Sequence, residues 1–146
     1  MTPSWTLHRT LVLTGNLCWH VRPLHGFPIV FEDSIVTFDI EATSGSTILL
    51  VTKPGIESTV AANFRPAGCV VLGKAALTER QNFRDTNQPT GWSARRGQYP
   101  GTFYPNMKAS GSSTRSTVTT SLGLAFAGVG AEVPHFISFQ LLQFNA

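Results

Sequence analysis

The stretch Phe136-Ile137-Ser138-Phe139-Gln140-Leu141-Leu142-Gln143-Phe144 lies at the end of the printed sequence and decides the predicted fold class. Apolar residues occupy both its even and its odd positions, which is typical of a strand that is covered on both faces. Chain termini usually fray unless a strand or helix docks against the rest of the protein. We therefore predict a buried strand here, in a sandwich core or at a contact between subunits.

Short alternating segments recur along the rest of the chain. Trp5 to Leu13 and Leu17 to Arg22 alternate apolar and polar residues, so they read as a hairpin around Thr14-Gly15-Asn16. Further predicted strands are Phe27–Phe31, Ile35–Glu41, Thr47–Thr52, Glu57–Phe64, Cys69–Leu72 and Ser116–Ala127. A turn signal every 8 to 12 residues favours an antiparallel β-sandwich of jelly-roll type. We predict one all-β domain over 1–146 with about nine strands.

The composition limits the classes of protein that fit. Only 13% of the residues are charged, so uncharged polar side chains and glycine must cover much of the surface. No stretch approaches the ~18 consecutive apolar residues of a membrane span, and the first residues lack the pattern of a signal peptide. We expect a soluble, unprocessed chain in which Cys18 and Cys69 are free thiols.

One long segment, 78–115, carries almost no apolar periodicity. It holds six basic and two acidic residues, a net charge of +4 against +3 for the whole chain. Guanidinium groups bind carboxylates or phosphates, and aromatic rings give contact area at a small entropic cost. We predict that this segment binds an acidic, stackable ligand such as a sialylated glycan, or packs as a structural arm between subunits. The candidate ligand-binding residues are Trp92, Arg95, Arg96, Tyr99 and Tyr104.

No known catalytic or metal-binding spacing stands out. His8, His20 and Cys18 share a face of the predicted hairpin, but zinc sites have tighter spacings and the neighbouring Arg22 opposes a cation. Nucleophile-elbow, phosphate-loop and dinucleotide-binding patterns are missing. A charge of +3 without a basic arm disfavours nucleic acid as a partner. We predict a protein without enzymatic activity, metal or cofactor, and keep a small hydrolase as an alternative.

Two families share short patterns with the chain. The closing strand Phe136–Leu141, together with Trp5-Thr6-Leu7 near the start, resembles an adenovirus-type fibre head. That resemblance implies a trimeric sandwich that recognises a host receptor such as a sialylated glycan and needs no cofactor. Asn63, Arg65 and Trp92 resemble part of the sugar site of galectins, but a His and a Glu of that site are missing, so no galectin residue is transferred.

These observations together predict a viral structural or attachment module. It would act as an oligomer, most simply a homotrimer, on the virion surface and in the host cytoplasm during assembly. It would bind a host receptor or acidic glycan through 78–115. The alternatives are a free lectin with a galectin-like sandwich, a purely structural capsid or decoration subunit, and the small hydrolase.

Overall fold

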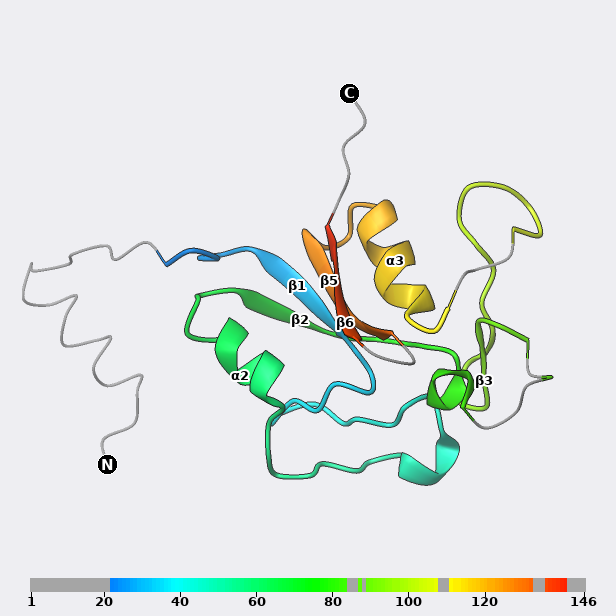
Figure 1. The fold of residues 1–146 in the computed structure, drawn as a ribbon, viewed down its shortest axis with the longest axis horizontal. Helices are drawn as coiled ribbons and strands as arrows, with labels where there is room; N and C mark the ends of the chain where they lie inside the picture. The colour runs from blue at the N-terminus through cyan, green and yellow to red at the C-terminus, as the bar shows by residue number, and fades with distance from the viewer. Residues whose placement is uncertain (1–21, 84–86, 88, 108–110, 133–135, 142–146) are drawn as a thin grey trace, which may run out of the picture.

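The computed structural model describes residues 22–83, 87, 89–107, 111–132 and 136–141. These form a mixed α/β fold around a four-stranded sheet (Figure 1). The strands are β1 (Pro28–Glu32), β2 (Val70–Ala75), β3 (Trp92–Ser93), β4 (Gly97–Gln98), β5 (Ala127–Glu132) and β6 (Phe136–Leu141). The helices are α2 (Thr59–Phe64) and α3 (Thr114–Ser121), with 3-10 turns η1 (Thr47–Leu49) and η2 (Glu79–Asn82). The prediction of an all-β jelly roll is wrong.

The four strands follow the order β2-β1-β5-β6. β1 pairs in parallel with β2 and with β5, whereas β6 pairs antiparallel with β5. Parallel neighbours need a long connection across a face of the sheet. α2 lies in the connection from β1 to β2 and α3 in that from β2 to β5, and Figure 1 shows the two helices on opposite sides of the sheet. The small pair β3–β4 is antiparallel and separate from this sheet.

The face of the sheet under α2 is the main apolar core. Ile29 and Phe31 of β1 are fully buried there, together with Ala61 of α2. The rings of Phe31 and Phe64 meet edge to face, with centroids 5.6 Å apart. Ser58 caps the helix, because its hydroxyl accepts a hydrogen bond from Ala61 N at 3.3 Å. The predicted strand 57–64 is therefore wrong: the cap and the packing of one apolar face make this segment a helix.

The face under α3 is built from small residues. A Cβ at Gly128 would lie 3.1 Å from Ser116 Cβ, and a Cβ at Gly130 would lie 2.7 Å from Ser113 Cβ. These two glycines let the helix lie directly against β5. The helix is rich in Thr and Ser, which are common in strands and compete with helical hydrogen bonds. That composition explains why the prediction of one strand over 116–127 is wrong.

Three of the predicted strands are confirmed in position. β1, β2 and β6 overlap the predicted strands 27–31 and 69–72 and the first part of the closing segment. The segment 35–41 contains no strand, and 47–52 begins with the turn η1.

The predicted hairpin over 5–22 lies almost wholly outside the described residues. The single domain and the association of copies stay predictions. Among the described helices, none has the length and apolar character needed to cross a membrane.

Candidate functional site

A buried carboxylate lies at the end of the central strand. Glu32 is the last residue of β1 and has no exposed surface. Its Oε1 accepts hydrogen bonds from Ser34 Oγ at 2.9 Å and Gln81 Nε2 at 3.1 Å. Its Oε2 accepts from Ala131 N at 2.8 Å and from the hydroxyl of Ser113. Four donors therefore compensate the cost of burying this charged group.

Gln81 reaches the carboxylate from an unusual turn. Arg80, Gln81 and Asn82 are three consecutive residues with positive φ, at 47°, 57° and 67°. Such a conformation costs free energy for any residue other than glycine and persists where surrounding contacts hold it. The side chain of Gln81 also donates to Ser34 Oγ at 3.0 Å. This turn therefore directs an amide donor to Glu32, and no sequence signal identifies it in advance.

Two serines, Ser112 and Ser113, lie immediately before α3. Ser113 is 6% exposed; its hydroxyl donates to Glu32 and lies 2.9 Å from Ala131 O. Ser112 is half-buried and donates to Ala131 O at 3.1 Å. Its own carbonyl accepts from Thr78 N at 3.0 Å. Ser112 is thus the more accessible of the two hydroxyls, and Ser113 lies beneath it.

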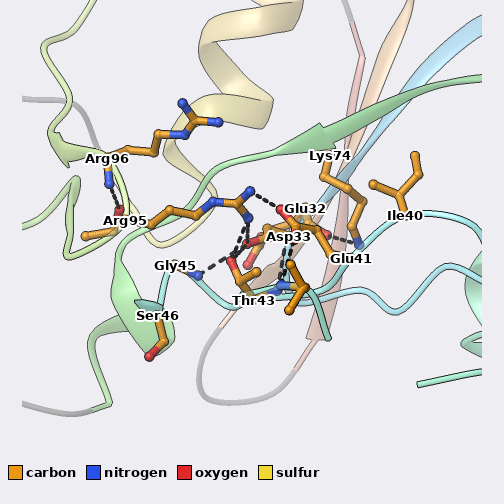
Figure 2. Close-up of polar contacts among 12 residues, drawn as sticks. Glu32, Asp33, Ile40, Glu41, Thr43, Gly45, Ser46, Lys74, Arg95 and Arg96 are labelled. Carbon is orange, nitrogen blue, oxygen red and sulfur yellow. Dashed lines mark hydrogen bonds and ion pairs between the residues drawn. The ribbon is translucent and has the colours of Figure 1, made fainter. Parts of the chain in front are cut away.

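Lys74 brings an amine to this end of β1. A register shift between β1 and β2 places Lys74 opposite Phe31. Its Nζ donates to Glu32 O at 3.2 Å and to Ile35 O (Figure 2). Burial lowers the pKa of Lys74 to about 8, although the carboxylates of Asp33, Glu32 and Asp39 oppose that shift. A lysine with such a pKa holds or releases its proton near neutral pH.

A second carboxylate, Asp33, is held by a loop and by Arg95 (Figure 2). It is 3% exposed and accepts from Thr43 N at 3.2 Å and Gly45 N at 3.3 Å. Arg95 lies 3.8 Å from Asp33 Oδ2 through Nη1, and its Nη2 pairs with Glu41. A backbone hydrogen bond from Val51, followed by Arg95, lowers the pKa of Glu41. Arg95 therefore ties 78–115 to the loop after β1.

The other predicted ligand-binding residues are distributed over several environments. Tyr99 is 4% exposed; its hydroxyl lies 3.0 Å from Ser93 Oγ, and the guanidinium of Arg115 lies 4.4 Å from its ring centroid. Trp92 is half-buried in β3, whereas Arg96 and Tyr104 are exposed. Of the predicted set, Arg95 is the residue that pairs with the carboxylates of Asp33 and Glu41, as Figure 2 shows. A ligand-binding role for the set stays a prediction.

The ion pairs of Arg95 give a direct stability prediction. We expect Arg95→Ala to lower the free energy of unfolding by roughly 2 kcal/mol, because the buried Asp33 loses its cation. Arg96→Ala is the matched control: Arg96 is exposed, and an exposed substitution changes stability by about 0.5 kcal/mol or less. Urea unfolding followed by circular dichroism measures both. Equal losses in the two variants would contradict the structural role of Arg95.

No sequence pattern predicted the residues that form this site. Glu32, Lys74, Ser112 and Ser113 come from segments separated by tens of residues, and no short motif joins them. A charged residue at the end of a buried strand and a Gly-Ser-Ser run before a helix are the signals that could have pointed to them. Within the described part of the chain, no group of three or more metal-ligating side chains occurs.

Comparison with known proteins gives one consistent result. The amidase family model matches residues 16–134. An Arthroderma benhamiae protein assigned to the amidases is 42% identical over 111 residues, which are 75% of this chain and 19% of that protein. A probable amidase of Arabidopsis thaliana is 37% identical over 110 residues, 75% of this chain and 22% of the relative. This chain thus spans about a fifth of the length of these curated relatives.

Solved structures agree with this result. The native peptide amidase of Stenotrophomonas maltophilia superposes with a TM-score of 0.74 at 33% identity, over 87% of this chain and 25% of that one. These findings overturn the predictions of a viral attachment module, a capsid subunit, a lectin and a non-enzyme. They equally overturn the virion surface as its location, since the relatives are cellular enzymes. The closing strand of the fibre-head pattern is the edge strand β6 of an α/β sheet, and Trp5-Thr6-Leu7 lie outside the described residues. The chain belongs to the amidase family.

Proposed function

We propose that this protein acts in the hydrolysis of carboxamide bonds. The observation that carries the proposal is the family match over 16–134, which includes the whole Glu32, Lys74 and Ser112–Ser113 site. Amide hydrolysis adds water across the C–N bond and releases a carboxylic acid and ammonia or an amine. It requires a proton acceptor for the attacking oxygen, donors for the developing oxyanion and a proton for the leaving nitrogen.

The described site offers groups suited to proton transfer. Ser113 donates its hydroxyl hydrogen bond to the carboxylate of Glu32, so a proton can pass between them without rearrangement. Lys74, with its pKa lowered to about 8, supplies a nearby amine that can be charged or neutral near neutral pH. Ser112 is the accessible hydroxyl beside them and would contact the amide of the substrate. The proposal thus assigns substrate contact to Ser112 and proton handling to the buried groups behind it.

The test is release of ammonia from a carboxamide. The purified protein is incubated with a C-terminally amidated peptide, and ammonia is measured with a coupled glutamate dehydrogenase assay. We expect Ser112→Ala to lower the rate at least ~100-fold, since one well-placed hydrogen-bonding group contributes on that scale to kcat. Ser121→Ala, at the exposed end of α3, is the matched control and should keep the rate.

Circular dichroism and the unfolding midpoint show whether the two variants fold equally well. Ser112 is half-buried and donates one hydrogen bond to Ala131 O, so its truncation should leave the spectrum unchanged and lower the free energy of unfolding by about 1 kcal/mol. Failure to detect ammonia above a heat-denatured sample, with several neutral amides, would contradict the proposed function. Equal rates in the wild type and Ser112→Ala would contradict the assignment of Ser112.

A further inference from the structure

A pocket of about 620 Å³ opens in the segment between η2 and α3. That volume lies within the range of small-molecule sites, roughly 300 to 1,000 Å³. Seven residues line it: Pro89, Thr90, Gln98, Tyr99, Pro100, Asn106 and Met107. Not one of these side chains is charged, although the surrounding segment is strongly basic.

The wall of the pocket is fixed by contacts within the chain. Gln98 donates from Nε2 to Thr90 O at 3.0 Å and to Tyr99 O at 3.4 Å. The hydroxyl of Tyr99 is hydrogen-bonded to Ser93. A backbone hydrogen bond from Gly101 N to Met107 O, 2.9 Å long, closes the loop on the other side. A pocket held in this way loses little conformational entropy when a ligand binds.

The pocket lies next to the proposed substrate contact. A Cβ at Gly111 would approach Thr90 Cγ2 to 2.6 Å, so the lining residue Thr90 lies against the residue that precedes Ser112. The side chain of Thr78 joins the same region, since its hydroxyl accepts from Gly91 N at 2.8 Å. The backbone of Ser112 is anchored there too, through Thr78 N. The residue that precedes Ser112 therefore lies against the wall of the pocket.

We propose that this pocket binds the uncharged, largely apolar group that carries the scissile carboxamide, such as an aromatic or aliphatic side chain. The inference rests on the proposed function, because it places the amide at Ser112. Proline, methionine and tyrosine supply apolar contact, and the lining offers a charged group no counter-ion. The substrates are thus neutral carboxamides rather than acidic or basic ones.

Binding is measured separately from hydrolysis. Ligand-observed NMR titration with phenylacetamide, glutaramate and 6-aminohexanamide compares a neutral aromatic, an anionic and a cationic carboxamide. We expect phenylacetamide to bind at least tenfold more tightly than either charged amide. Thr90→Asp places a carboxylate in the lining and should weaken phenylacetamide binding about tenfold. Thr90→Val keeps the shape and adds no charge, so it should leave the affinity within twofold of the wild type.

The outcomes separate this inference from the proposed function. If phenylacetamide binds with the expected preference and Thr90→Asp weakens it, the pocket assignment holds even where ammonia release is absent. If the protein releases ammonia but binds the three amides equally, the pocket assignment fails and the proposed function stands. Equal affinities in Thr90→Asp and Thr90→Val would also overturn the pocket, whatever the ammonia assay gives.

Discussion

Replacing Glu32 with leucine is expected to lower the free energy of unfolding by roughly 3 to 5 kcal/mol. The carboxylate is fully buried and accepts hydrogen bonds from Ser34, Gln81, Ser113 and Ala131. Leucine has a similar size but no acceptor, so four donors would lose their hydrogen bond to Glu32 in a region with little water. The loss would be largest at the N-terminal end of α3, where Ser113 ties the helix to β1.

Ser34→Ala is the control for this change. It removes one of the four donors and leaves the carboxylate with three, and Ser34 is itself half-buried. It also removes the acceptor of Gln81, so we expect a cost of about 1 to 2 kcal/mol for the two hydrogen bonds lost. Urea unfolding at neutral pH measures both variants. A loss below about 1 kcal/mol for Glu32→Leu would show that the network contributes little to stability.

The sequence predicts individual strands of this fold better than it predicts the architecture. The apolar run Ile29-Val30-Phe31 identifies a buried strand because both faces of β1 are covered. Ile29 and Phe31 pack with Ala61 of α2, and Val30 packs with Ala75 and Ala125. The closing strand β6 is recognised because apolar residues occupy both its even and its odd positions. Whether neighbouring strands run parallel, however, depends on what crosses between them. The two helices that cross between the parallel strands are short, and their sequences do not show a helical period.

The two helices were missed for different physical reasons. α2 has only six residues, too few to show a helical period, and its stability comes from Ala61 and Phe64 packing against the sheet. α3 is made of Thr and Ser, which favour strands by intrinsic preference. Tertiary contact overrides that preference, because Gly128 and Gly130 let the small side chains of the helix approach the sheet closely.

The site was beyond the reach of sequence patterns for a related reason. The arginine and aromatic residues of 78–115 favoured the prediction of a surface that binds an external ligand. In the structure, Arg95 pairs with carboxylates of the same chain and Tyr99 is buried. The candidate site instead combines Glu32, Lys74 and Ser113, which come from segments far apart in the sequence. Burial decides the chemistry of such groups, and a single sequence does not show which polar residues are buried.

Lys74 is expected to make the protein more stable as the pH rises from about 8 to 10.5. Burial lowers the pKa of Lys74 from 10.5 to about 8 in the folded chain. Below pH 8 the lysine is protonated in both states, so the folded state carries the full cost of the buried charge. Between the two values the unfolded chain keeps a proton that the folded chain has released, and stability therefore increases with pH. A shift of this size corresponds to about 3 kcal/mol.

The measurement compares the wild type with Lys74→Met by urea unfolding at pH 7.5 and pH 10.5. Other groups titrate over this range, but they do so in both proteins, and their contributions cancel in the difference. The wild type should gain about 3 kcal/mol relative to Lys74→Met across the interval. Lys53→Met, at an exposed lysine, should show no such gain. A difference between wild type and Lys74→Met that stays constant with pH would mean that Lys74 is solvated in the folded protein, and it would remove the amine from the proposed proton-transfer site.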